Sequence, residues 1–175
     1  MTNNFNKMRF FFFLAMLVVL INTTSVDAYY TGRKPENGII YVELGSVDQK
    51  YRNSWTSAFV NWSERNSYRS IRYRSGSSNL MTAQYDSSRP NAYGRIVYNN
   101  SSSKYTTPFR TYLNTYRSQI VNNSNVRIST ASHEIGHALG LADLEDSSHS
   151  IMNTKRDRTT LIYATSRDIS RVNAQ

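Results

Sequence analysis

Cysteine is absent from this chain of 175 residues. Its absence excludes a disulfide scaffold, a structural zinc site with cysteine ligands and a thiol nucleophile. The length allows one domain, or one domain with a tail, and the sequence contains no internal repeat or long linker. Thirteen tyrosines and two tryptophans must supply much of the cohesion that disulfide bonds often give a small exported protein.

Acidic residues are also few: 12 Asp and Glu stand against 21 Lys and Arg, a formal net charge of +9. This excess predicts a general attraction to anionic surfaces such as cell-wall polymers. Arginines interleave with tyrosines over residues 68–74, which favours a solvated strand face. No recognised nucleic-acid module accompanies them, so we expect no specific nucleic-acid partner. We expect a monomer.

Long hydrophobic runs are missing as well, because the longest one covers only residues 10–21. Twelve residues rise about 18 Å in a helix, against about 30 Å for the hydrocarbon core, which disfavours a membrane anchor. Lys7 and Arg9 precede the run, and Val26 and Ala28 occupy the −3 and −1 positions of a cleavage site. We therefore expect a signal peptide at residues 1–28, a mature domain at 29–175 and an extracellular location. Export without cysteine fits a bacterial secreted protein.

Hydrophobic periodicity gives a coarse order of strands and helices. We expect strands at residues 38–44, 71–74, 80–85 and 94–99, and helices at 47–65, 108–120, 126–141 and 166–172. Strands followed by helices without strict alternation predict the α+β class, with a mixed sheet in a single domain.

The most informative segment is residues 133–143, which read His-Glu-Ile-Gly-His-Ala-Leu-Gly-Leu-Ala-Asp. His133 and His137 are four residues apart, so on a helix both imidazoles leave one face and can chelate one ion. Glu134 follows the first of them, where its carboxylate reaches a water on the metal rather than the metal itself.

Gly140 can take a positive φ, end the helix and reverse the chain. That reversal would bring Asp143 back toward the ion as a third ligand, and carboxylate oxygen is an ordinary zinc ligand. Three protein ligands leave a fourth position open, which distinguishes a catalytic zinc site from a structural one. His149 is a rival third ligand, but no fixed turn determines its reach.

This segment resembles the zinc signature of the metzincin metalloproteases, H-E-x-x-H-x-x-G-x-x-H/D, and most of all its matrixin branch. Residues 150–153, Ser-Ile-Met-Asn, resemble the Met-turn of that family. The resemblance implies Zn²⁺ as cofactor, with Met152 as a packed floor beneath it rather than a ligand. It also implies a twisted sheet above a cleft, with an edge strand that pairs with the substrate. By position that strand is residues 94–99, the last strand expected before the active-site helix.

The sequence departs from the matrixin pattern in several ways. Asp143 stands where animal matrixins have His, as in similar bacterial secreted proteases of the snapalysin type. The tyrosine that some metzincins use to stabilise the oxyanion is missing, because Thr154 occupies its position. Tyr163 is a possible substitute, although packing is the favoured role for it. The absence of cysteine excludes a cysteine-switch propeptide.

No clear calcium loop is present, and the sequence leaves calcium binding open. Asp86, Glu145 and Asp146 are isolated acids, which we expect to face solvent.

These features predict a secreted zinc endopeptidase that acts on proteins or peptides, with Glu134 as the general base. The alternative is a secreted zinc-containing protein that binds peptides or anionic wall polymers with little turnover. Glu134 argues against that alternative, because a binding protein needs no base beside its metal.

Overall fold

The computed structural model describes residues 31–65, 68–99 and 104–175. The expected signal peptide and its cleavage site lie outside the described residues, as does most of the polar segment after residue 99. The strands are β1 (Ile39–Leu44), β2 (Ser70–Tyr73), β3 (Leu80–Gln84), β4 (Gly94–Tyr98) and β5 (Phe109–Asn114), and the helices are α2 (Gln49–Arg65), α3 (Ser118–Asn122), α4 (Ser124–Ala138) and α5 (Ser166–Asn173). Within these ranges no helix combines the length and apolar character needed to cross a membrane.

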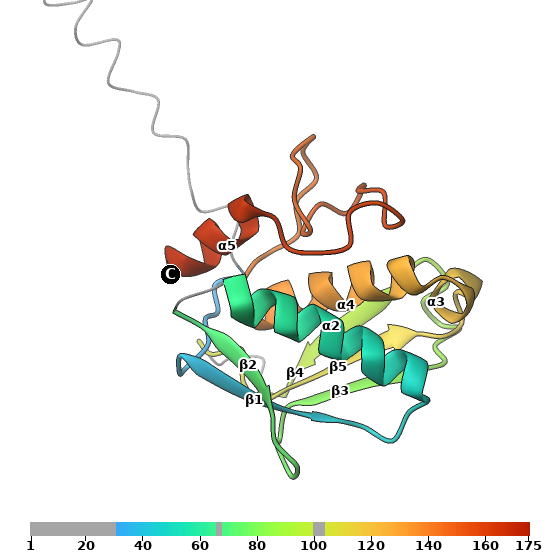
Figure 1. The fold of residues 1–175 in the computed structure, drawn as a ribbon, viewed down its shortest axis with the longest axis horizontal. Helices are drawn as coiled ribbons and strands as arrows, with labels where there is room; N and C mark the ends of the chain where they lie inside the picture. The colour runs from blue at the N-terminus through green and yellow to red at the C-terminus, as the bar shows by residue number, and fades with distance from the viewer. Residues whose placement is uncertain (1–30, 66–67, 100–103) are drawn as a thin grey trace, which may run out of the picture.

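The described strands form one five-stranded sheet in the order β2-β1-β3-β5-β4. β4 runs antiparallel to β5, whereas the other neighbouring pairs are parallel. The long helix α2 and helix α4 lie together on one face of this twisted sheet, and the short helix α5 closes the chain (Figure 1). The predicted α+β class is therefore confirmed, together with the mixed sheet, the long helix and the short C-terminal helix.

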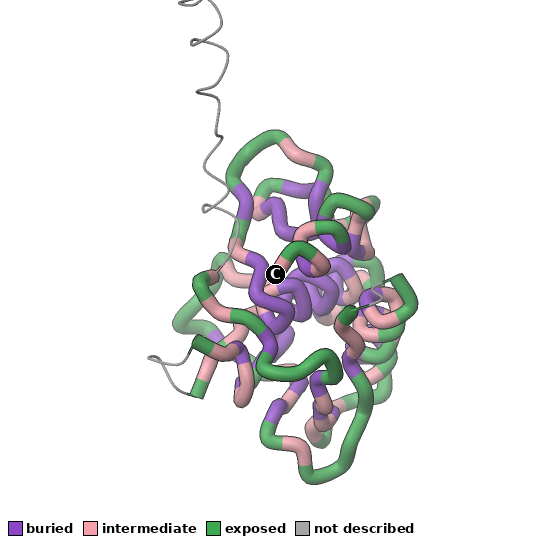
Figure 2. Tube along the Cα trace, turned by 90° about the vertical axis from the view of Figure 1, so that its left-hand side faces the viewer, coloured by how far each residue is buried: buried purple, intermediate pink, exposed green. Residues whose placement is uncertain are grey.

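The two tryptophans hold the layers together. Trp55 is fully buried, and its indole Nε1 donates a hydrogen bond of 2.9 Å to the carbonyl oxygen of Thr82 in β3. Trp62 lies about two turns further along α2, and its Nε1 donates to the carbonyl oxygen of Ser132 in α4 at 2.9 Å. Burying these rings with their polar atoms satisfied ties α2 to both the sheet and α4. Figure 2 shows the buried residues gathered inside the molecule, with exposed residues on the outer loops.

The helix expected over residues 108–120 is wrong. Residues Phe109–Asn114 form β5, and a short helix follows only at Ser118–Asn122. β5 lies between β3 and β4, so five of its six residues are buried and the alternation typical of a half-exposed strand is lost. The spacing of the apolar residues in this segment resembles one face of a helix. The hydrogen bonds that β5 makes with both neighbouring strands nevertheless determine its structure.

β5 also changes the expected order, because it, and not β4, is the last strand before α4. β4 nevertheless lies at the edge of the sheet, where its outer side pairs with no other strand of the described chain.

Candidate metal and catalytic site

Helix α4 carries His133, Glu134 and His137 through the centre of the molecule. It begins after Asn123, whose side-chain oxygen accepts hydrogen bonds from the backbone N–H groups of Asn125 and Val126 at 3.0 and 3.2 Å. Most of its residues are buried between α2 and the sheet, including His133 and Glu134. Packing on both sides therefore fixes the positions of the three side chains.

The helix ends in a Schellman turn at Gly140, whose φ is +94°. The N–H of Leu141 donates to the carbonyl oxygen of Gly136 at 3.0 Å, the long-range bond of that motif. A side chain at residue 140 would collide with the backbone of Arg33 and the side chain of Gln175. Glycine therefore meets both a conformational and a steric requirement, and the chain reverses toward the helix face.

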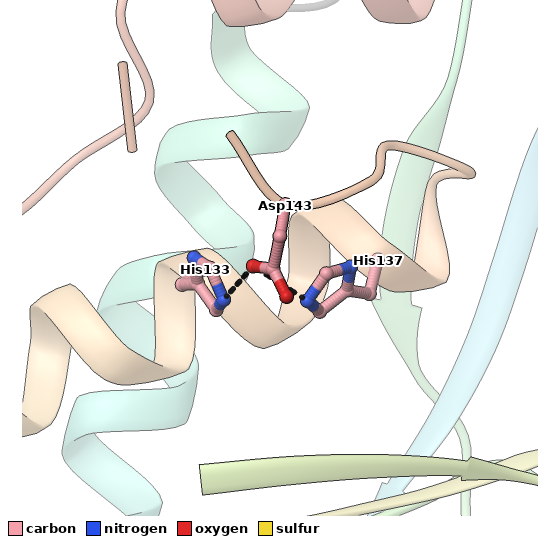
Figure 3. A group of neighbouring side chains, drawn as sticks. All are labelled: His133, His137 and Asp143. Atoms are coloured by element: carbon pink, nitrogen blue, oxygen red, sulfur yellow. Dashed lines mark ion pairs between the residues drawn. The ribbon is translucent and has the colours of Figure 1, made fainter. Parts of the chain in front are cut away.

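The reversal places the carboxylate of Asp143 between the two imidazoles (Figure 3). Its Oδ1 atom lies 3.0 Å from Nε2 of His133 and 3.5 Å from Nε2 of His137. One ligand atom from each of the three residues lies within 4.8 Å of the others. Bonds of about 2.05 Å around a tetrahedral ion place neighbouring donor atoms about 3.3 Å apart. The observed separations bracket that value, so the cluster can hold a metal ion.

Both imidazoles are oriented by backbone carbonyl groups. Nδ1 of His133 lies 2.9 Å from the carbonyl oxygen of Ile151, and Nδ1 of His137 lies 2.8 Å from that of Leu141. A carbonyl oxygen only accepts, so a neutral ring that donates to it carries its proton on Nδ1 and turns a bare Nε2 toward Asp143. The shorter contact of His133 Nδ1, with Ile151, favours this tautomer, while Nη1 of Arg156 lies 3.1 Å from the same atom. This is the tautomer that binds a metal, held by the outer hydrogen bond that metal-ligating histidines generally make.

The electrostatics of the cluster distinguish the two rings. Burial lowers the pKa of His133 to about 4, and the guanidinium of Arg156 acts in the same direction. Burial also lowers the pKa of His137, but the nearby carboxylates of Asp143 and Glu134 outweigh it and raise that pKa above its usual value. Burial opposes ionisation of Asp143, yet hydrogen bonds from the imidazoles, when a proton occupies the nitrogen that faces it, hold its carboxyl pKa well below the usual range. The cluster thus favours an ionised carboxylate.

Glu134 is 4% exposed, and burial raises its pKa to about 7. It does not belong to the three-residue cluster, but it lines the same cavity of about 140 Å³ as His133 and Asp143. Among the described residues, no hydrogen bond engages its carboxylate. A carboxylate with a pKa near neutrality, free of partners and beside a metal-binding cluster, is suited to proton transfer.

Strand β4 runs along the side of α4 at this cavity. A Cβ atom at Gly94 would lie 2.8 Å from both the Glu134 carboxylate and the Thr130 side chain, so the strand approaches the helix closely there. At the other end, the Tyr98 hydroxyl donates to the carbonyl oxygen of His137 at 3.0 Å. The free edge of the sheet therefore lies beside the predicted base and the last turn of α4.

Met152 is fully buried against the side of α4 that faces away from β4. A Cβ atom at Gly136 would overlap the Met152 sulfur, which explains a glycine in mid-helix that costs about 1 kcal/mol relative to alanine. The turn that carries Met152 is held by Asp168, which accepts from the N–H of Ile151 at 2.9 Å and from the Ser150 hydroxyl. The same turn supplies the carbonyl oxygen that orients His133.

Asp168 is a residue that the sequence reasoning missed. Its carboxylate also accepts from the N–H of Thr165 at 2.8 Å, in a capping box whose N-cap is Thr165, the residue directly before α5. The pattern Thr-x-x-Asp was the available signal for this cap.

The other predicted residues lie outside the cluster. His149 is exposed and lines a separate hollow, together with Tyr163. Thr154 lines the cavity of Glu134, whereas Tyr163 does not. Glu145 and Asp146 are exposed, as expected.

The expectation for Asp86 is wrong, because this residue is only 9% exposed. Its carboxylate accepts hydrogen bonds from the Tyr112 hydroxyl and the Ser88 hydroxyl, each at 2.6 Å, and pairs with Arg89. Tyr112 lies on β5, which the sequence reasoning had placed in a helix, so this partner was not foreseen.

Two arginines that the sequence reasoning missed line the Glu134 cavity: Arg156 and Arg158. They follow the Met152 turn by four and six residues, but no known spacing rule marks them. Tyr93, just before β4, lines the same cavity.

Comparisons with known proteins add little to this geometry. No protein-family model matches the chain, and no curated protein matches its sequence. Among solved structures, that of myroilysin is similar at 16% sequence identity and a TM-score of 0.47. The alignment covers 65% of this chain and 53% of the myroilysin chain, so this chain spans about half of that protein. At such similarity the functional assignment depends on the site's own geometry.

Proposed function

We propose that this chain is a secreted zinc-dependent endopeptidase. The observation that carries the proposal is the position of Glu134, a buried carboxylate without a hydrogen-bond partner in the described chain. It shares one cavity with His133 and Asp143, two of the three residues whose donor atoms converge. A binding protein would need the cluster but not the adjacent carboxylate.

Zinc suits the donor set of the cluster better than calcium or magnesium. Two imidazole nitrogens and one carboxylate oxygen are typical zinc ligands, whereas the two alkaline-earth ions prefer oxygen donors alone. His133, His137 and Asp143 would hold the ion. When bound, zinc supplies Lewis-acid activation of water and of the scissile carbonyl group.

Glu134 would act as the general base and then as the acid. Its carboxylate takes a proton from the attacking water and delivers it to the leaving nitrogen of the peptide bond. A pKa of about 7 suits both transfers near neutral pH, because the protonated and ionised forms of Glu134 are then similarly populated. Burial keeps bulk water from competing for that proton.

The substrate would be an extended protein or peptide segment. Strand β4 offers free backbone N–H and C=O groups beside the site, and an added strand would pair with them through main-chain hydrogen bonds. Such pairing recognises the backbone and does not require one particular sequence. Secretion is supported by the leader pattern at residues 1–28, and we propose that the protein acts as a monomer.

The test uses the purified protein with an unfolded protein as substrate. We expect cleavage at internal bonds, loss of cleavage after chelation, and recovery when zinc is added back. Mass spectrometry of the fragments distinguishes internal cleavage from trimming at the ends. Zinc binding without any cleavage would favour the alternative of a zinc-containing binding protein.

A further inference from the structure

Two guanidinium groups lie over the ring of Tyr93 at the rim of the Glu134 cavity, and a third lines the same cavity. The central carbon of Arg117 lies 4.3 Å from the ring centroid, and that of Arg158 lies 4.4 Å from it. Arg156 lines the same cavity as Tyr93 and Arg158. In the described ranges, no carboxylate lies within 4 Å of any of these three arginines. Glu134 and Asp143 line the same cavity but, in the part of the chain that the structure describes, form no ion pair with these arginines. A positive cluster without a paired carboxylate beside the site favours an anionic group of the substrate.

Only one of the three arginines is available to bind such a group. Arg156 is 9% exposed, and its donors are directed to the Ser129 hydroxyl, the Ser129 carbonyl and the Asn153 carbonyl at 2.9–3.1 Å. Its Nη1 also lies 3.1 Å from Nδ1 of His133. Arg117 donates to the Pro90 carbonyl at 2.9 Å and to the Tyr93 hydroxyl at 2.7 Å. Both therefore serve chiefly to hold the loop and the turn in place.

Arg158 is half-buried, and its donors are mostly unused. One Nη donates to the carbonyl oxygen of Thr154 at 3.2 Å, and the buried Nε has no hydrogen-bond partner. Contact with the Tyr93 ring and the Thr154 carbonyl fixes the plane of the guanidinium. A guanidinium held in this way loses little conformational freedom when a carboxylate binds to it.

The cavity is small, at about 140 Å³, compared with about 300–1,000 Å³ for pockets that hold drug-sized ligands. It therefore suits a single short side chain or a chain terminus. Glu134 lines the same cavity, so a group bound by Arg158 would lie close to the scissile bond.

We propose that Arg158 binds a carboxylate of the substrate, so that the enzyme prefers peptide bonds adjacent to such a group. This inference rests on the proposed peptidase function. The carboxylate comes either from an Asp or Glu side chain or from the substrate's own C-terminus, and the test separates the two sources.

The first measurement compares three peptides of otherwise identical sequence. The first peptide has Glu beside the cleaved bond, and both of its ends are blocked. The second has Gln at that position and blocked ends. The third also has Gln there, but this Gln is the last residue and its C-terminal carboxylate is free. We expect kcat/KM for the Glu peptide to exceed that for the blocked Gln peptide by about tenfold, as a charge-assisted hydrogen bond typically provides. A preference for the third peptide over the Glu peptide would identify the chain terminus as the source.

Variants assign the preference to Arg158. In Arg158→Ala, kcat/KM for the carboxylate-bearing peptide should be about equal to that for the blocked Gln peptide. Arg158→Lys should retain part of the difference, because the positive charge remains. The matched control is Arg72→Ala, which removes the same charge from an exposed position on β2, at the sheet edge opposite β4. We expect the control to keep the wild-type ratio. Circular dichroism verifies that each variant is folded.

A second measurement needs no catalysis. Metal-free protein is titrated with each peptide carrying a fluorescent label, and binding is followed by anisotropy. We expect tighter binding of a carboxylate-bearing peptide, and loss of this difference in Arg158→Ala. Discrimination without any cleavage by the zinc-loaded protein would overturn the peptidase function and leave the Arg158 site standing. Cleavage with equal rates on all three peptides, or with a ratio unchanged in Arg158→Ala, would overturn the inference about Arg158.

Discussion

Two aspartates that follow regular elements differ in the atoms that surround their carboxylates. Asp86, after β3, is nearly buried and accepts hydrogen bonds from hydroxyl, amide and guanidinium groups, all of which are donors. Asp143, after α4, has a side chain that is 50% exposed and lies against two imidazole nitrogens whose ring protons point the other way. Asp86 is thus fully satisfied by the protein, whereas Asp143 faces atoms that are themselves acceptors.

This difference separates an anchoring acid from a ligand. A carboxylate saturated by donors stabilises the fold and has no further bond to offer. A carboxylate that converges with two bare nitrogens gains only when a cation joins them. The following predictions test that distinction, beginning with the largest expected effect.

Asp143→Ala should remove the metal without unfolding the chain. The substitution takes away one of three ligands from a half-exposed position, so we expect zinc affinity to fall by far more than the roughly 10–100-fold typical of changes outside the ligand set. Bound zinc per chain is measured after dialysis, with circular dichroism as the check on folding.

Asp86→Ala and His149→Ala are the matched controls for that loss. The first removes a carboxylate that anchors β5, so it should lower the melting temperature while zinc remains bound. His149→Ala removes the exposed histidine outside the cluster and should change neither the melting temperature nor the amount of bound zinc. Retention of zinc by Asp143→Ala together with its loss from His149→Ala would show that the third ligand has been misassigned.

Glu134→Gln should leave zinc bound and reduce hydrolysis by about 10²–10⁴-fold, the usual contribution of a general base. Gln has nearly the same shape, and the ligands are untouched. Steady-state cleavage of a blocked peptide gives the rate, and metal analysis of the same sample gives the occupancy. Activity within about tenfold of wild type would exclude Glu134 as the base.

Gly136→Ala should destabilise the protein by about 1–3 kcal/mol, the usual cost of overpacking a core. The added methyl group would overlap the Met152 sulfur and must displace it. Denaturant unfolding measures the cost. The comparison substitution Gly76→Ala has open space around its Cβ, although its φ of +74° adds backbone strain. A smaller loss for Gly136→Ala than for Gly76→Ala would contradict the close packing described between α4 and Met152.

The smallest expected effect is a pH dependence of stability from Asp86. Hydrogen bonds from Ser88 and Tyr112 lower the pKa of Asp86 to about 2, against about 3.9 in an unfolded chain. The unfolded state therefore binds its proton first, so the stabilisation is present above about pH 4 and is lost as the pH falls toward 2. Asp86→Asn should lack this contribution. Unfolding free energies of the two proteins that remain parallel from pH 5 to pH 2 would argue against a low pKa for Asp86.

Much of the site could be predicted from sequence because its geometry is local. The spacing of His133 and His137 follows from helix periodicity, and Gly140 lies within three residues of Asp143. The strand β5 could not be predicted in the same way. Its apolar residues fit a helical period, and only its position between β3 and β4 makes it a strand. Local patterns are readable when their partners lie within a few residues.

Contacts between distant segments were not predictable. Asp86 depends on Tyr112, 26 residues away, and Gly136 depends on Met152 on the turn beneath the helix. Arg158 joins the Glu134 cavity because the chain after Met152 folds back toward Tyr93. No signal in a single sequence marks such pairs, because the local pattern around each residue gives no indication of its distant partner.

The central claim is that one zinc ion, held by His133, His137 and Asp143, works with Glu134 to hydrolyse peptide bonds. The most direct test is to titrate chelated protein with zinc while following cleavage of a peptide blocked at both ends. We predict that activity rises linearly and reaches a plateau at one zinc per chain. Full activity before zinc is added, or one tightly bound zinc per chain with no cleavage, would contradict the claim.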